Sequence, residues 1–555
     1  MEDKLVSETD FDAISEEAKR LGQGVAEILI SRGFVTNPYY ENLLSKYFNV
    51  SMANLTSRSI DESVLKLLPE ELSRQKRTVL FGKEPDGAIS AAMEDPSDLV
   101  NIEFLERYLK TRIRPYLTVT SGLNKGFALY GEAVSIDYNK LIEEDIIASK
   151  QSKFKGEDAA KDMPIVSIVD NILSYAMAIR ASDVHIEIFD DAILVRYRID
   201  GILKEVFKIP KEIHPAVAAR IKLLGGLKID EHSRPQDGRF RYQIGRDVID
   251  IRVAVMPTFY GEKVEMRLLP ASTRPLSFTE LGMLPDTVKI LEENIKKSYG
   301  MMLVTGPTGS GKSTTLYSVL GRLNRPEVNI VTVEDPVEYD IKFINQTQIN
   351  VKAGITFADG LRAILRQDPN VIMVGEIRDS ETAEIAVQSA LTGHLVLSSL
   401  HTNDATTAVP RFIDINVQPF LVAAVLNIII AQRLVRQICK SCMYSYAPSE
   451  ELIAALSKQV KDLGITDNFK MPKFIYAGKG CSVCGGSGYR GRIGIFEVLN
   501  VTEEVRKLII SPDFSLDKLR QLAKEEGMIT MFEDGLRKIE TGVTTIDELL
   551  RVIRE

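Results

Sequence analysis

The sequence has no tryptophan and no run of apolar residues long enough to cross a membrane. A membrane-spanning helix needs roughly 20 consecutive apolar residues. The longest candidate, Phe420–Ala431, is shorter and leads into Gln432 and Arg433. The first residues, MEDKLVSETD, are acidic and lack the apolar core of a signal peptide. We therefore expect a cytoplasmic protein that approaches a membrane only through its partners.

Excess positive charge is also absent. The chain of 555 residues carries 69 Lys and Arg against 77 Asp and Glu, a formal net charge of −8. Direct binding of nucleic acid usually requires a basic stripe interleaved with aromatic side chains, and the sequence has no Lys/Arg cluster of that kind. With 45% hydrophobic and 26% charged residues the composition is that of an ordinary globular protein. The length suggests roughly three or four domains.

Cysteine is scarce, with four residues that all belong to two C-x-x-C pairs. The pairs are Cys439 with Cys442 and Cys481 with Cys484. A reducing compartment disfavours disulfides, whereas two such hooks present four sulfur ligands to one tetrahedral Zn²⁺ ion. We expect a structural zinc site with a small subdomain between the hooks. Four unrelated thiols are the alternative.

What the sequence does contain is a complete phosphate-binding motif. Residues 301–314 read MMLVTGPTGSGKST, and 306–313 fit G-x-x-x-x-G-K-[ST] at every position. The glycines let backbone N–H groups cradle phosphate oxygens, Lys312 reaches the terminal phosphates of ATP, and the Ser313 hydroxyl ligates Mg²⁺. The predicted nucleotide contacts are Gly306, Pro307, Thr308, Gly309, Ser310, Gly311, Lys312, Ser313 and Thr314.

Carboxylates end two apolar segments downstream of this P-loop. Glu334 and Asp335 end the segment IVTVED, Glu338 follows closely, and Glu376 ends VIMVGE. In open α/β folds the carboxyl ends of the strands form the ligand-binding edge of the sheet. We therefore expect Glu376, Glu338 and Glu334 to serve the Mg²⁺ ion and the attacking water. Acids at strand ends can also be simple caps.

Two of the five histidines, His394 and His401, flank a further apolar segment, LVLSSL. A histidine at a strand end can sense the γ-phosphate, so we assign His394 to catalysis and His401 to nucleotide contact. Arg252 and Arg267 stand in the middle of predicted strands, where an arginine is costly unless it meets an anion. Such arginines can stabilise charge on a transferring phosphoryl group, in the same chain or a neighbour. Structural histidines and a salt bridge within the sheet are the alternatives.

The residue pattern predicts an α/β protein with several domains. In the C-terminal half, short apolar strands at 301–305, 330–333, 371–375 and 395–398 alternate with helices, which predicts a mostly parallel sheet covered on both faces. The predicted domains are an N-terminal α+β interaction domain (1–148), a polar linker (149–162), a second α+β domain (163–275) and a P-loop ATPase domain (281–555) with an inserted zinc subdomain (437–491).

Together these motifs resemble those of the ATPases that power type II secretion and type IV pilus assembly. The resemblance spans roughly residues 160–500 and is looser before 140. The matching segments are ASDVHIE at 181–187, RYRIDG at 196–201, RPQDGR at 234–239, the P-loop, VEDPVE at 333–338, GEIRD at 375–379, TGH at 392–394, His401 and both C-x-x-C pairs.

The resemblance implies a RecA-like ATPase core, a PAS-like second domain and a cytoplasmic homo-hexameric ring that hydrolyses ATP. Nucleotide would bind between the second domain and the core, within reach of Arg252 and Arg267, and the four cysteines would hold zinc. The family acts on a platform protein of the inner membrane, together with adaptor proteins. ATP, Mg²⁺ and Zn²⁺ are thus the implied cofactors.

Within the family we favour pilus extension over type II secretion. Retraction motors are shorter and lack the cysteine hooks. A DNA-uptake or nucleic-acid translocase on the same core is disfavoured by the acidic balance, and a regulatory nucleotide-binding scaffold would leave the acids idle. Some relatives bind cyclic di-GMP through Arg-Leu-Gly-x-x-Leu-x-x-x-Gly. Here Arg20-Leu-Gly22 is present but the following positions are out of register, so the sequence does not favour this ligand.

Overall fold

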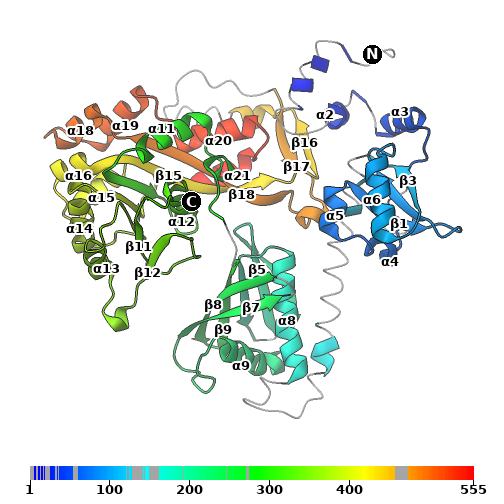
Figure 1. Cartoon of the computed structure of the whole chain (residues 1–555), viewed down its shortest axis with the longest axis horizontal. Coiled ribbons are helices and arrows are strands. Elements are labelled where there is room, and N and C mark those ends of the chain that lie inside the picture. The colour runs from blue at the N-terminus through cyan, green and yellow to red at the C-terminus, as the bar shows by residue number, and fades with distance from the viewer. Residues whose placement is uncertain are drawn as a thin grey trace. The chain divides into compact units, whose positions relative to one another are not determined.

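The computed structural model (Figure 1) describes residues 60–119, 162–190, 192–244, 247–270, 274–454 and 473–554 without gaps, together with parts of 6–59, 122–127 and 142–148 and residue 456. The predicted linker lies, except for Asp162, outside the described residues, as do Arg20, Leu21 and Gly22. The chain divides into two compact units. The first comprises Met1–Ala271, Ile438–Ala447 and Tyr476–Arg490, and the second comprises Ser272–Gln437, Pro448–Ile475 and Gly491–Glu555.

The first part of unit 1 is a small α+β fold with a three-stranded sheet in the order β1-β2-β3. Strands β1 and β2 are antiparallel, and β2 and β3 are parallel because helix α6 connects them. Asp98 begins α6 by accepting a hydrogen bond from the Asn101 N–H. The elements are α2 (Val25–Ser31), α3 (Asn37–Phe48), α4 (Glu62–Leu65), α5 (Glu70–Gln75), β1 (Thr78–Lys83), β2 (Ile89–Met93), α6 (Leu99–Leu109) and β3 (Ile113–Leu117).

The second part of unit 1 is an antiparallel six-stranded sheet in the order β6-β5-β4-β9-β8-β7. Alternate residues of its strands pack with α8 and α9 in one apolar core, so both helices cover the same face. The opposite face carries the charged residues of β4, β5, β8 and β9. The elements are α8 (Met163–Ala178), β4 (Asp183–Ile188), β5 (Ile193–Ile199), β6 (Ile202–Ile209), η2 (Lys211–Ile213), α9 (His214–Leu224), β7 (Gln236–Ile244), β8 (Asp247–Thr258) and β9 (Gly261–Pro270).

Unit 2 contains the seven-stranded sheet β12-β11-β13-β14-β10-β15-β18. Strands β12, β11, β13, β14, β10 and β15 pair in parallel with their neighbours, as the strand–helix alternation predicts. The strands and their connections are β10 (Gly300–Thr305), α12 (Lys312–Leu323), β11 (Ile330–Glu334), β12 (Ile344–Gln348), η3 (Val351–Ala353), α13 (Phe357–Ile364), β13 (Val371–Val374), α14 (Ser380–Leu391), β14 (Leu395–Leu400), α15 (Ala408–Asp414), α16 (Pro419–Val425), β15 (Leu426–Ile438) and β18 (Tyr489–Asn500).

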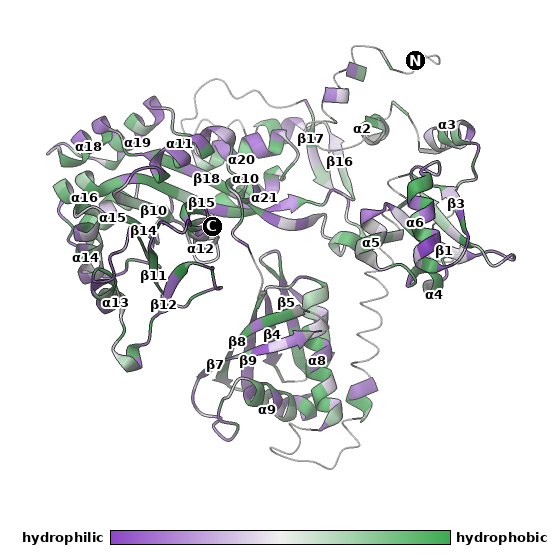
Figure 2. Ribbon diagram, viewed as in Figure 1, coloured by the Kyte–Doolittle hydropathy of each residue, from purple (hydrophilic) through white to green (hydrophobic). Residues whose placement is uncertain are grey.

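The remaining helices of unit 2 are α10 (Phe278–Leu281), α11 (Pro285–Ile295), α18 (Glu503–Ile510), α19 (Leu516–Glu525), α20 (Met531–Glu540) and α21 (Ile546–Arg554). The apolar run Phe420–Ala431 is divided between α16 and the buried first half of β15, which is green in Figure 2. The part of the run in β15 is apolar because it is buried in the sheet. Among the described residues no helix combines the length and apolar character that a membrane span requires.

Candidate functional site: a P-loop, an acidic edge and a cysteine cluster

The phosphate-binding loop joins the fully buried strand β10 to helix α12, which begins at Lys312. Gly306 has φ of 146°, and a Cβ atom there would lie 2.5 Å from the Gln432 carbonyl oxygen and 2.6 Å from Ser310 Oγ. Only glycine fits this approach. Gln432, on β15, holds the loop through two hydrogen bonds. Its Nε2 donates to the Ser310 carbonyl oxygen at 2.6 Å, and Thr315 Oγ1 donates to its Oε1 at 2.6 Å.

The Lys312 ammonium lies over the phosphate-binding loop. Its Nζ donates to the carbonyl oxygens of Gly306 at 2.8 Å and Pro307 at 3.1 Å. Burial lowers the pKa of Lys312, and the nearby Glu376 carboxylate acts in the opposite direction. An anion bound in the loop would favour the charged lysine. The residues therefore fit a nucleotide phosphate.

Parallel pairing gathers further site residues at the edge where the P-loop lies. Thr305 pairs with Leu400, and Val333 pairs with Val374. The residues that follow these strands, His401 and Glu376, therefore share one edge of the sheet. His401 Nε2 lies 3.2 Å from Glu376 Oε2, and Arg378 pairs with the other carboxylate oxygen.

The acidic segment after β11 is tied to the P-loop helix. Glu334 is 4% exposed, and its carboxylate accepts hydrogen bonds from Tyr317, from Thr332 Oγ1 at 2.5 Å and from Gln346 Nε2 at 3.1 Å. Burial raises the pKa of Glu334. The backbone N–H of Glu338 donates to the Tyr317 hydroxyl at 3.1 Å. Glu334 is thus held inside the protein, whereas Glu376 faces the edge.

His394 lies at the opposite edge of the sheet. It precedes the first residue of β14, and Leu395 pairs with Gly300 at the start of β10, whereas the P-loop follows Thr305 at the end of β10. Its Nδ1 is 2.9 Å from the Ser389 carbonyl oxygen. The prediction that His394 reaches the nucleotide of its own chain is therefore not supported by its position. A strand of six residues separates the two histidines.

Arg252 and Arg267 belong to one row across the antiparallel sheet of unit 1. Strand register pairs Arg239 with Arg252, Arg252 with Arg267, Arg267 with Asp183, and Asp183 with Arg198. Arg267 Nε donates to Asp183 Oδ1 at 2.8 Å. Burial opposes ionisation of Asp183, but the hydrogen bonds from Arg267 and Ser182 hold its pKa below the usual value. Four guanidinium groups thus share a row with one carboxylate, and like charges directly opposite each other are unfavourable.

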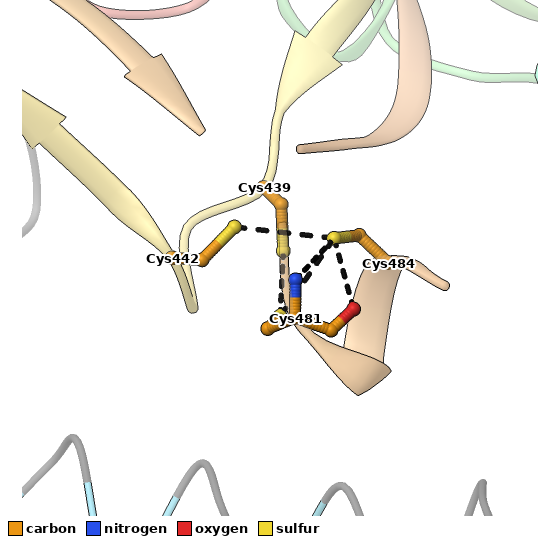
Figure 3. Close-up of side chains that lie close together, drawn as sticks. All are labelled: Cys439, Cys442, Cys481 and Cys484. Carbon is orange, nitrogen blue, oxygen red and sulfur yellow. Dashed lines mark hydrogen bonds between the residues drawn. The ribbon is translucent and has the colours of Figure 1, made fainter. Parts of the chain in front are cut away.

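The four cysteine side chains converge, as Figure 3 shows. All four Sγ atoms lie within 4.8 Å of one another. They extend from the end of β15 and from η4 (Ser482–Cys484), beside the two-stranded sheet of β16 (Met443–Tyr446) and β17 (Ile475–Gly478). The N–H groups of Cys481 and Gly488 donate to Cys484 Sγ at 3.1 and 3.2 Å. Burial raises the pKa of Cys439 to about 11, while those N–H groups outweigh burial at Cys484 and bring its pKa to about 7. Four converging sulfurs fit tetrahedral Zn²⁺.

The sequence did not identify Gln432, Tyr317, Arg378 or Gln346, which position the predicted residues. Each is distant in sequence from the P-loop or belongs to no short motif. Gln432 could have been singled out from the sequence, because it is a polar residue at the end of a long apolar run.

A glycine-rich loop at the carboxyl edge of a mostly parallel sheet defines this core as a RecA-like P-loop ATPase. The solved structure of the ATPase DotB from Legionella pneumophila shares the fold, with a TM-score of 0.51 and 20% identity over 69% of this chain and 95% of that chain. The predicted fold class is confirmed.

The chain belongs to the type II/IV secretion system protein family, whose sequence model matches residues 158–551. A model of the MshEN domain matches residues 48–129. The type IV pilus assembly ATPase PilB of Myxococcus xanthus (strain DK1622) is 38% identical over 557 residues, covering 99% of this chain and 97% of that protein. The type II secretion system protein E of Dickeya dadantii (strain 3937) is 45% identical over 420 residues, covering 76% of this chain and 81% of that protein.

These relatives confirm the resemblance seen in the motifs. The chain is a motor ATPase of the secretion and pilus class, and ATP with Mg²⁺ is the cofactor pair that this class implies.

Proposed function

We propose that this chain is the motor ATPase that drives extension of a type IV pilus, acting as a cytoplasmic homo-hexamer on an inner-membrane platform protein and its adaptors. The observation that carries the proposal is the extent of the likeness. The pilus assembly ATPase of M. xanthus matches 99% of this chain, whereas the type II secretion protein of D. dadantii leaves about a quarter unmatched. Type II secretion remains the second candidate, because its identity of 45% over the shared part exceeds 38%.

In the proposed reaction the loop backbone of 306–313 and Lys312 bind the β- and γ-phosphates, and Ser313 holds Mg²⁺. The Lys312 ammonium already lies at the loop, where it donates to the carbonyl oxygens of Gly306 and Pro307. When nucleotide binds, it would exchange these oxygens for phosphate oxygens. A bound Mg²⁺ ion would supply positive charge beside the transferring phosphoryl group. Glu376 accepts the proton of the attacking water. His401 and Arg378 hold the Glu376 carboxylate in place, each by one of its two oxygens.

The arginines of unit 1 are proposed to act on the phosphates of a bound nucleotide, in the same chain or in a neighbour. Guanidinium groups suit the planar recognition of phosphate oxygens, and strand register aligns four of them in this row. Such a row on a domain that moves against the core would make closure depend on the γ-phosphate. The four cysteines are proposed to hold one structural Zn²⁺ ion.

Replacing Lys312 with Ala tests the enzyme itself. The substitution removes the cation that faces the phosphates and leaves the glycine backbone in place, so turnover should fall by about three decades or more. The measurement is the rate of phosphate release by the purified protein. Lys289→Ala, an exposed lysine on α11, is the matched control and should keep the wild-type rate.

The same two variants in the source bacterium test the biological role. With Lys312→Ala in the chromosomal gene and normal protein levels, surface pili should disappear while protein secretion into the medium continues. Loss of secretion with pili intact would assign the chain to type II secretion instead. Normal pili and normal secretion would overturn both roles.

A further inference from the structure

The hydroxyl of Tyr317 connects the P-loop helix to the acidic segment that follows β11. Tyr317 lies on α12, which begins at Lys312, and the residue is 1% exposed. Its O–H donates to Glu334 Oε2, and the backbone N–H of Glu338 donates to its oxygen at 3.1 Å. A single hydroxyl group therefore contacts both glutamates of the segment, one through its carboxylate and the other through its backbone.

Packing fixes the ring that carries this hydroxyl. The rings of Tyr317 and Tyr339 meet edge to face, with centroids 4.6 Å apart. Gln346, on the neighbouring strand β12, donates to the Tyr339 carbonyl oxygen at 3.2 Å and accepts from the Ile341 N–H at 2.9 Å. The segment 338–341 therefore packs against the Tyr317 ring, and helix α12 carries that ring.

The electrostatics of Glu334 depend on the same hydroxyl. Burial raises the pKa of Glu334, and the negative charge of Glu338 acts in the same direction. Hydrogen bonds from Thr332, Tyr317 and Gln346 oppose this by stabilising the ionised form. The groups that act on Glu334 are Tyr317 from α12, Thr332 from β11 itself, Glu338 and Tyr339 from the segment after β11, and neutral Gln346 from β12.

We propose that Tyr317 is a positioning residue for ATP hydrolysis, holding Glu334 and the backbone of Glu338 in a fixed register with the P-loop helix. The proposal rests on the ATPase function proposed above. Because α12 starts at Lys312, any displacement of the helix on phosphate binding is transmitted to the acidic segment through this hydroxyl. The tyrosine does not touch the nucleotide. It acts through the two glutamates.

Tyr317→Phe removes the hydroxyl and keeps the ring contact with Tyr339. We expect kcat to fall about tenfold or more, on the scale of a misplaced acid–base group, while the dissociation constant for ATP changes by less than about threefold. The fall should therefore appear in kcat and not in the affinity for ATP.

Tyr339→Phe is the matched control, because Tyr339 takes part through its ring and its carbonyl oxygen, and both survive the substitution. It should keep the wild-type kcat and ATP affinity. Unchanged turnover by Tyr317→Phe, or a loss of ATP binding equal to the loss of turnover, would overturn the proposal. Lys312→Ala in the same assay separates this from failure of the function: if it still turns over ATP, the nucleotide site itself has been misassigned.

Discussion

Single side chains decide whether the acidic edge performs chemistry or only supports the sheet. Glu376 is the carboxylate best placed for chemistry. Its side chain is 14% exposed, its charge acts on Lys312, and His401 and Arg378 orient it. Glu334 is held inward by three donors. The two acids therefore have different tasks, although the sequence places both at strand ends.

Replacing Glu376 with Gln should separate binding from hydrolysis. The amide keeps the shape of the side chain but cannot accept the proton of the attacking water, so turnover should fall by a factor of about 10² to 10⁴. ATP affinity should stay near the wild-type value, because Lys312 and the loop backbone are untouched. Equilibrium binding and single-turnover hydrolysis on one preparation measure both. If binding and turnover decline together, Glu376 is a metal or structural group.

At this scale, contiguous motifs were predictable and long-range partners were not. The P-loop residues follow one another in sequence, so their chemistry can be recognised without a fold. Gln432 reaches Ser310 only because β15 pairs with β10. The sequence could not tell at which edge of the sheet His394 lies, because a histidine at each end of a strand looks equivalent until the strand direction is known. Parallel pairing with β10 supplies that direction.

At the scale of secondary-structure elements, the folded state of the segment around the two C-x-x-C pairs is expected to depend on a metal ion. They connect the ends of two long strands, β15 and β18, through the short sheet of β16 and β17. Two strands of four residues bury little apolar surface of their own. A metal ion is the natural source of stability for such a segment.

Metal analysis of the purified protein should find about one Zn²⁺ per chain. The double change Cys439→Ser and Cys442→Ser removes two sulfur ligands and should release the ion, lowering the melting temperature and exposing the segment between the hooks to protease. Lys440→Ala, an exposed residue inside the same hook, should retain the metal. Wild-type stability after removal of the metal by a chelator would refute the structural role.

The short apolar strands of the core sheet were predicted, and the polar strands β12 and β7 were missed. The buried strands β10, β11, β13 and β14 read as apolar runs because a parallel sheet covered by helices buries both faces. Strand β12 (INQTQ) lies at the edge of the sheet, and β7 alternates charged with apolar residues, so neither gave a strong signal. Their placement depends on pairing with neighbours rather than on their own composition.

At the scale of the whole molecule, the arginine row and the P-loop belong to different units of one motor. The composition and the family indicate an ATPase, but they do not say which chain's nucleotide the arginines serve. In the proposed hexamer that property would belong to the assembled ring, so no pattern within one sequence can determine it. The row itself could be predicted only in part: Arg252 and Arg267 were singled out, but their alignment with Arg239 and Arg198 follows from strand register.

Arg252→Ala should bind ATP within roughly tenfold of wild type and lose most turnover, because we propose that its guanidinium acts on charge that develops on the γ-phosphate. Arg267→Ala should do the same and also lower stability. Its partner Asp183 is 4% exposed and has a lowered pKa, so the ion pair stabilises the fold above the usual aspartate pKa and loses that contribution as the pH falls. The stability difference between wild type and Arg267→Ala should therefore shrink towards acidic pH.

Mixing two inactive chains then determines which nucleotide the row serves. A mixed ring would combine Lys312→Ala chains with Arg252→Ala chains. The Arg252→Ala chain keeps an intact P-loop, and the Lys312→Ala chain keeps an intact Arg252. These two intact parts can form one working site only if the arginine acts on the nucleotide of the neighbouring chain. Partial recovery of turnover on mixing would assign Arg252 to the adjacent chain's nucleotide, and no recovery, with mixed rings demonstrated by mass, would assign it to its own. The coupling itself has a separate test. If both arginine variants melt at lower temperature but retain full turnover per folded molecule, the row is a structural ion-pair array and the motor must sense its nucleotide elsewhere.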